Sequence, residues 1–98
     1  MDFIDAARNG YLSIVQSYVS RNINVNILND FGYTALMYAS LNDHYDVVEY
    51  LLKYGADVNI INSRSYNAII YATLSGNIST VKLLVKHKAN INVSDFNG

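Results

Sequence analysis

The sequence contains no cysteine, no proline and no tryptophan. Without cysteine there is no disulfide framework, no thiolate zinc site and no cysteine nucleophile. Its uninterrupted apolar runs are far shorter than the roughly 20 residues that cross a bilayer, so no membrane partner is expected. Asp2 and Asp5 stand near the start, where a secretory signal would carry a basic segment and an apolar block. We therefore expect an intracellular protein, located in the cytoplasm.

An excess of either charge is also missing, because seven basic and eight acidic residues give a net charge of −1. Residues 1–61 carry a net charge of −4 and residues 62–98 a net charge of +3. The late lysines fall near a predicted helix end, where cations interact favourably with the helix dipole. A dedicated nucleic-acid binder would show a basic excess over the whole domain. No nucleic-acid partner is therefore expected.

What the sequence does contain is a repeated unit, which appears when the chain is aligned with itself. Residues 29–61 align with residues 62–94 without a gap, and eleven of the aligned positions are identical. Residues 1–28 align as a truncated first unit, and residues 95–98 align with the start of a unit. A repeat of this length indicates stacked structural units that each contact only their neighbours.

Each unit is predicted to hold two helices. In residues 29–61, Thr34 is an N-cap for a helix over 35–41, and Asp43 occupies a left-handed turn. A second helix is predicted from Tyr45 to Tyr54 and ends at Gly55. Its apolar residues share one face: Val47, Val48, Leu51 and Leu52. Two helices with one apolar face each must stack on neighbouring copies, which predicts an all-α solenoid.

The opening and closing segments of the unit resemble the ankyrin repeat. The resemblance rests on Asn29-Asp30-Phe31-Gly32-Tyr33-Thr34-Ala35-Leu36, on Ala39, His44, Val47 and Val48, and on Leu51 through Asn59. The same pattern covers nearly all of the chain. It implies helix-turn-helix units joined by β-hairpin loops that project sideways.

Catalysis is not indicated by the residues present. His44 and His87 occupy different positions of the unit, and His44 matches a structural position of the family. The spacing of Asp43, His44 and Asp46 at the start of a helix does not bring three ligands around one metal ion. Phosphate-binding loops, catalytic triads and zinc motifs are also missing. We expect no enzyme activity, no cofactor and no metal.

The resemblance implies that a protein partner is held by the loop tips and by the first helix of each unit. Carried over by position, the partner-binding residues are Asp30, Phe31, Tyr33, Leu41, Asn42, Tyr54, Ser63, Arg64, Tyr66, Leu74, Ser75 and His87. An alternative is that Tyr33 and Tyr66 only cover the base of the loops. Tyr38 and Tyr71, which fall inside the first helices, are interpreted as packing residues.

The function predicted on this basis is a non-catalytic ankyrin-repeat module for protein-protein interaction, with a partner whose identity the sequence does not give. One alternative is a recruitment segment of a larger multidomain enzyme or effector. The other is a purely structural repeat spacer.

The last unit carries the apolar residues Ile69, Ile70, Leu84 and Val85. We therefore expect either continuation of the array or self-association at the C-terminal end.

Asparagine recurs at one position of every unit, at Asn26, Asn59 and Asn92. We interpret these residues as a ladder whose side-chain amides hold the loop backbone. In the ankyrin family this asparagine can also be hydroxylated. The segment from Leu51 through Asn59 resembles that recognition sequence, so Asn59 is the candidate for hydroxylation.

Overall fold

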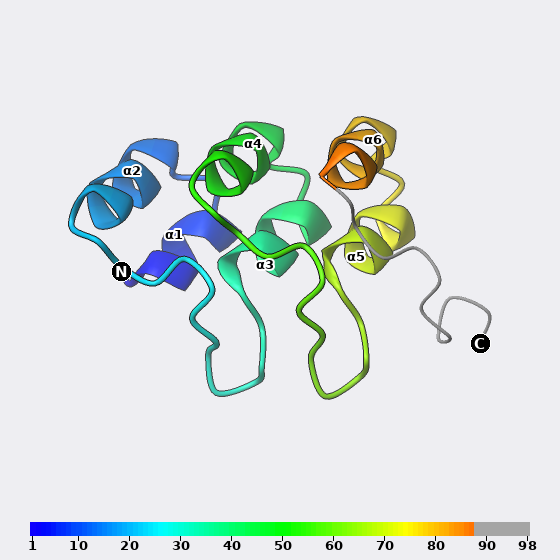
Figure 1. Ribbon diagram of the computed structural model, residues 1–98, viewed down its shortest axis with the longest axis horizontal. Coiled ribbons are helices and arrows are strands. Elements are labelled where there is room, and N and C mark those ends of the chain that lie inside the picture. The colour runs from blue at the N-terminus through cyan, green and yellow to red at the C-terminus, as the bar shows by residue number, and fades with distance from the viewer. Residues whose placement is uncertain (88–98) are drawn as a thin grey trace.

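The structure, a computed structural model, describes residues 1–87 as six short helices and the loops that join them. In chain order the helices are α1 (Phe3–Arg8), α2 (Leu12–Ser20), α3 (Ala35–Leu41), α4 (Tyr45–Lys53), α5 (Ala68–Leu74) and α6 (Ile78–Lys86). Figure 1 shows two layers, with α1, α3 and α5 in one and α2, α4 and α6 in the other. The expected all-helical stack is confirmed. Asn92 and the segment 95–98 lie outside the described residues.

The loops after α2 and α4 project away from the helical layers (Figure 1). Each closes at its base through one backbone hydrogen bond, from Asn29 N to Tyr33 O and from Asn62 N to Tyr66 O, both at 3.0 Å. Residues 1–87 contain no β-strand, so the expected β-hairpins are reduced to these closed loops.

Short polar side chains begin the helices of the first layer. Thr34 Oγ1 accepts a hydrogen bond from the backbone N–H three residues later at 3.2 Å, as the sequence predicts. Asn67, at the same position of the next unit, does the same through Oδ1 at 3.0 Å. Asp2 caps α1 in this way at 2.8 Å. Each cap satisfies a backbone donor that the first helical turn leaves without a partner.

A left-handed residue turns the chain from the first helix of each unit into the second. Gly10 and Gly76 have φ values of 77° and 74°, and Asp43 adopts a φ of 60° at the same position. The left-handed turn predicted at Asp43 is therefore confirmed. Gly55 follows α4 with a φ of 98°, which agrees with the predicted helix end.

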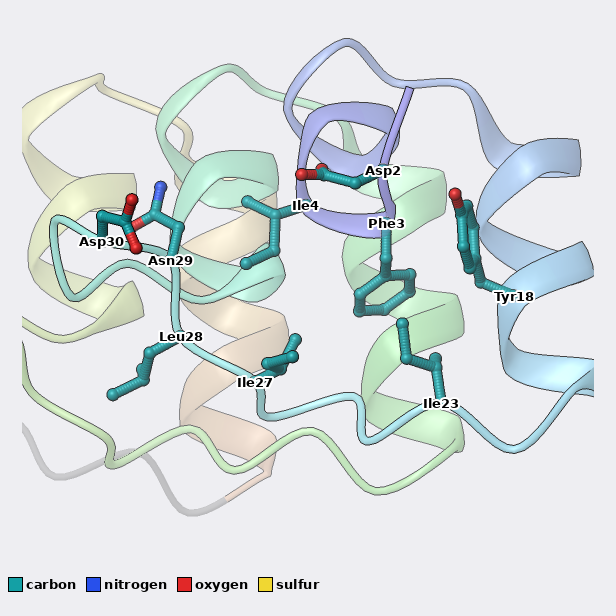
Figure 2. A pocket seen from close by; sticks show the side chains of 9 residues that line it. All are labelled: Asp2, Phe3, Ile4, Tyr18, Ile23, Ile27, Leu28, Asn29 and Asp30. Atoms are coloured by element: carbon teal, nitrogen blue, oxygen red, sulfur yellow. The ribbon is translucent and has the colours of Figure 1, made fainter.

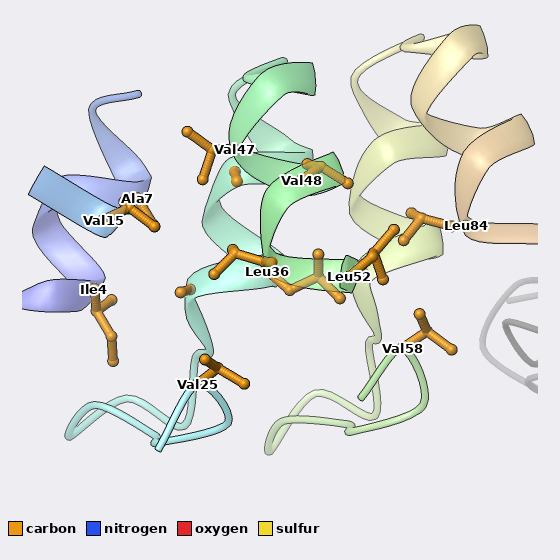
Figure 3. Packing of buried hydrophobic residues seen from close by; sticks show 14 of the residues in the cluster. Ile4, Ala7, Val15, Val25, Leu36, Val47, Val48, Leu52, Val58 and Leu84 are labelled. Atoms are coloured by element: carbon orange, nitrogen blue, oxygen red, sulfur yellow. The ribbon is translucent and has the colours of Figure 1, made fainter. Parts of the chain in front are cut away.

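The core lies between the two layers and runs through all three helix pairs (Figure 3). In α4 the predicted apolar face is confirmed, because Val47, Val48 and Leu51 are fully buried and Leu52 nearly so. Leu84 in α6 is also fully buried. Burial of such side chains contributes about 1.5–3 kcal/mol each. Every unit therefore depends on its neighbours for stability.

Consecutive units are also joined by hydrogen bonds from side chains to the last carbonyls of the first-layer helices. Asn42 Nδ2 donates to the carbonyl oxygen of Arg8 at 3.0 Å, and His44 Nε2 lies 3.0 Å from the same oxygen. Because a carbonyl oxygen only accepts, His44 Nε2 carries the proton. One unit later, Ser75 Oγ donates to the carbonyl oxygen of Leu41 at 2.7 Å. These bonds satisfy acceptors that a helix end leaves open.

Replacing Thr80 by valine is expected to raise the free energy of unfolding by about 1 kcal/mol. Thr80 is fully buried, and its hydroxyl has no hydrogen-bond partner among residues 1–87. Valine has nearly the same shape, and Val47 already fills this position in the preceding unit. Urea denaturation followed by circular dichroism measures the change. Thr73→Val is the matched control. It should not raise the free energy of unfolding, because the Thr73 hydroxyl donates to the Ile69 carbonyl at 2.7 Å. A destabilised Thr80→Val variant would contradict the expectation.

Candidate functional site

A cavity of about 400 Å³ lies between the tips of the two loops and α3. The residues that line it are Phe31, Tyr33, Tyr38, Leu41, Ser63 and Arg64. All except Tyr38 belong to the partner-binding set that the sequence selected. Tyr38 was interpreted as a packing residue because it falls inside a helix, and it is only half-buried. The cavity therefore combines two loops that hold the same position in successive units.

The first loop is held by the side chain of Asn29. Its Oδ1 accepts hydrogen bonds from the backbone N–H groups of Phe31 and Tyr33, both at 3.0 Å. Its Nδ2 donates to the Tyr38 hydroxyl at 3.1 Å. The amide thus fixes the loop tip against α3. Phe31 stands at this tip with 74% of its surface exposed.

Asn62 repeats this arrangement in the second loop and is more deeply buried, with 8% exposure. Its Oδ1 accepts from the backbone N–H groups of Arg64 at 3.0 Å and Tyr66 at 3.2 Å. Its Nδ2 donates to the Tyr71 hydroxyl at 2.8 Å. One buried amide therefore satisfies three groups and fixes the backbone at Arg64.

Four tyrosine rings form a continuous row along the base of the loops. Tyr33 stacks on Tyr38 with ring centroids 4.7 Å apart and an interplanar angle of 16°. The ring of Tyr71 lies 5.5 Å from Tyr33 on one side and 5.5 Å from Tyr66 on the other. The Tyr71 hydroxyl donates to the Tyr33 hydroxyl at 2.9 Å. Tyr33 and Tyr66 thus both pack against the ring of Tyr71 at the base of the loops.

The hydroxyl of Tyr71 remains protonated at neutral pH. Burial raises the pKa of Tyr71 to about 12, and the hydrogen bond to Tyr33 adds to this increase. The hydrogen bond from Asn62 and the positive charge of Arg64 lower the pKa of Tyr71, although by less. A protonated Tyr71 can therefore accept from Asn62 and donate to Tyr33 at the same time. It connects the two loops through side chains alone.

Several predicted residues lie away from the cavity. Asn42 and Ser75 use their side chains in the hydrogen bonds between units. Tyr54 follows α4, where its ring centroid lies 4.6 Å from that of Tyr50, and His87 is exposed at the end of α6. Both follow helices of the other layer. Leu74 is 65% exposed at the end of α5.

Asp30 lines a second cavity, of about 280 Å³, between α1 and the segment that follows α2 (Figure 2). Its lining residues are Asp2, Phe3, Ile4, Tyr18, Ile23, Ile27, Leu28, Asn29 and Asp30. This cavity is not among the sites predicted from the sequence. The available signal was a cluster of large apolar residues directly after α2, of which Ile27 and Leu28 are exposed.

One position of the predicted asparagine ladder, Asn26, makes side-chain bonds to the turn of the next unit. Asn26 Nδ2 donates to the Gly55 carbonyl oxygen at 3.2 Å, and Asn26 Oδ1 accepts from Asp57 N at 2.8 Å. The predicted role of Asn26 in holding the next turn is therefore confirmed. Asn59 is exposed in that turn, and its backbone N–H donates to Asp57 Oδ1 at 2.9 Å. Hydroxylation of Asn59 stays a prediction.

His44 takes part in the contact between the first two units. His44 bonds to the Arg8 carbonyl, and its ring packs against Gly10. Across the described part of the chain, no three His, Cys, Asp or Glu side chains gather closely enough to hold a metal ion. In the same residues, no helix has the length and hydrophobicity needed to traverse a bilayer.

Comparison with known proteins supports the assignment of the repeat. The family model for ankyrin repeats, in three copies, matches residues 3–95. No curated protein matches the sequence. The match covers all six helices and both loops, so the resemblance seen in the sequence is confirmed.

Proposed function

The chain belongs to the ankyrin-repeat family, and on that premise we propose that it binds a protein partner in the cavity between its two loops. Ankyrin repeats are generally protein-interaction modules and are typically non-catalytic. The observation that carries the proposal is the composition of the cavity, where Phe31, Tyr33, Tyr38 and Arg64 come together. Aromatic and arginine side chains dominate the binding energy of protein interfaces.

The shape and rigidity of the surface support the same proposal. Phe31 is widely exposed beside the cavity, so contact with a partner would remove a large apolar area from water. The loop tips are fixed by Asn29 and Asn62, so binding would restrict few additional degrees of freedom. From the predicted set, we propose direct contact for the residues that line the cavity, and we add Tyr38 to them.

Replacing Phe31 by alanine is expected to weaken partner binding by on the order of 2 kcal/mol. The ring of Phe31 makes no aromatic contact within residues 1–87, so the variant should retain the fold and its melting temperature. Binders are first selected with the full chain from a library of random dodecapeptides. Dissociation constants of the selected peptides are then measured by fluorescence anisotropy for the wild-type and variant chains.

Ile78→Ala is the matched control, because Ile78 is an apolar side chain with similar exposure, 69%, on α6. Its removal should leave the dissociation constants within about a factor of two, as for a surface substitution away from the interface. Loss of binding in Ile78→Ala together with normal binding in Phe31→Ala would show that the partner uses another face. A purely structural spacer would give no selected peptide that depends on Phe31.

A further inference from the structure

The tyrosines of the cavity carry hydroxyl protons that no acceptor uses. Asn62 donates to the Tyr71 hydroxyl, and Tyr71 in turn donates to the Tyr33 hydroxyl. Asn29 donates to the Tyr38 hydroxyl. Tyr33 and Tyr38 thus act as acceptors in these bonds, and within residues 1–87 neither hydroxyl donates to any protein group. Tyr33 and Tyr38 both line the cavity, so hydroxyl donors are available beside it.

The charged side chains at the cavity are arginines, which also donate hydrogen bonds. The Arg64 side chain lines the cavity, and the Arg8 guanidinium lies 5.6 Å from the centre of the Tyr38 ring. No Asp or Glu lines this cavity, and neither arginine forms an ion pair with a carboxylate in the described part of the chain. One arginine and two tyrosines therefore line the space, a second arginine lies against one of these tyrosines, and acidic side chains are absent from the lining.

From this excess of donors we propose that the cavity recognises an aspartate or glutamate side chain of the partner protein, next to an apolar residue. This inference rests on the proposed function. The carboxylate would accept from Arg64 and from the hydroxyls of Tyr33 and Tyr38, because an ionised carboxylate is purely an acceptor. The neighbouring apolar side chain would contact Phe31 and Leu41, which also line the cavity.

Aromatic rings with arginine also occur in sites that bind single-stranded nucleic acid. The cavity lining opposes that occupant, because Arg64 is its one charged side chain, whereas single-stranded nucleic acid is bound along a positively charged groove. A nucleic acid brings a row of phosphates to such a surface, whereas a peptide brings one carboxylate to one arginine. The local positive charge at Arg64 and Arg8 fits a single anionic group.

The test is a double-mutant cycle between the full chain and the peptides selected from the random library. In the strongest peptide, each acidic residue is changed to its amide, and Arg64→Gln is made in the protein. Either change alone is expected to weaken binding about tenfold, and the second change should then have little further effect. Arg21→Gln is the matched arginine control and should not couple to the peptide, because Arg21 lies over Tyr18 on α2, away from the cavity.

The outcomes separate this inference from the proposed function. Selected peptides that lose affinity in Phe31→Ala but contain no required acidic residue would overturn the carboxylate inference and leave the proposed function standing. Peptides that bind equally to wild type and Phe31→Ala would contradict both. A fluorescent single-stranded DNA dodecamer that bound more tightly than the acidic peptides, with loss in Arg64→Gln, would also overturn the inference.

Discussion

The substitution Asn62→Ala is expected to lower the free energy of unfolding by about 3 kcal/mol, because three hydrogen bonds of a buried amide are lost and each contributes roughly 1 kcal/mol. Asn62 is 8% exposed and satisfies the N–H groups of Arg64 and Tyr66 and the hydroxyl of Tyr71. Alanine leaves these groups without their partner. Urea denaturation followed by circular dichroism measures the loss.

The equivalent residue in the preceding loop provides a graded comparison. Asn29 makes the same three bonds but is less deeply buried, so water can replace part of what Asn29→Ala removes. Its expected effect is therefore smaller than that of Asn62→Ala. Ser63→Ala changes an exposed side chain in the same loop as Asn62 and should be neutral. Equal effects in Asn62→Ala and Ser63→Ala would show that the amide does not hold the loop.

The substitution Gly10→Ala is expected to destabilise the protein by about 3 kcal/mol, since a backbone penalty and a steric penalty add. Gly10 has a φ of 77°, where a side chain costs roughly 1–2 kcal/mol. A β-carbon there would also lie 2.5 Å from His44 Nδ1, far inside normal contact. The ring must then move and give up its bond to the Arg8 carbonyl, which joins the first two units.

A substitution at Gly76 measures the backbone penalty without the steric penalty. It adopts a φ of 74° at the same position of the last unit, but no atom would lie within 4 Å of an added β-carbon. Gly76→Ala should therefore show the backbone penalty alone, about 1–2 kcal/mol. In a His44→Ala background, Gly10→Ala should cost no more than Gly76→Ala. If Gly10→Ala and Gly76→Ala are equally destabilising in the wild-type chain, His44 does not restrict this turn.

The arrangement of the helices could be predicted from the sequence because it depends on local signals that recur in each unit. The cap at Thr34, the left-handed turn at Asp43 and the buried face of α4 were all predicted correctly. Each of these features needs only a few neighbouring residues. The β-hairpins implied by the resemblance are not confirmed, since each loop closes through one backbone bond at its base and residues 1–87 contain no strand.

The candidate site could be predicted only in part, because its geometry depends on how two units stack. Phe31 and Arg64 meet at one cavity since the two loops lie side by side, which the repeat implies. The contribution of Tyr38 required the stacking of its ring on Tyr33, which no sequence pattern specifies. Tyr54 and His87 were selected by analogy of position, but they follow helices of the other layer.

The bonds between units have a direction, which bears on how such a chain can change in length. Each unit offers a carbonyl at the end of its first helix, and the following unit supplies the donors, as Asn42 does for Arg8 and Ser75 for Leu41. After a tandem duplication of residues 29–61, the Asn42 of the second copy would lie beside the Leu41 carbonyl of the first copy. That carbonyl already accepts a hydrogen bond in the present chain. The duplicated segment would also bring another loop, and with it another recess between adjacent tips. Growth by whole units thus multiplies recognition sites without redesigning any of them.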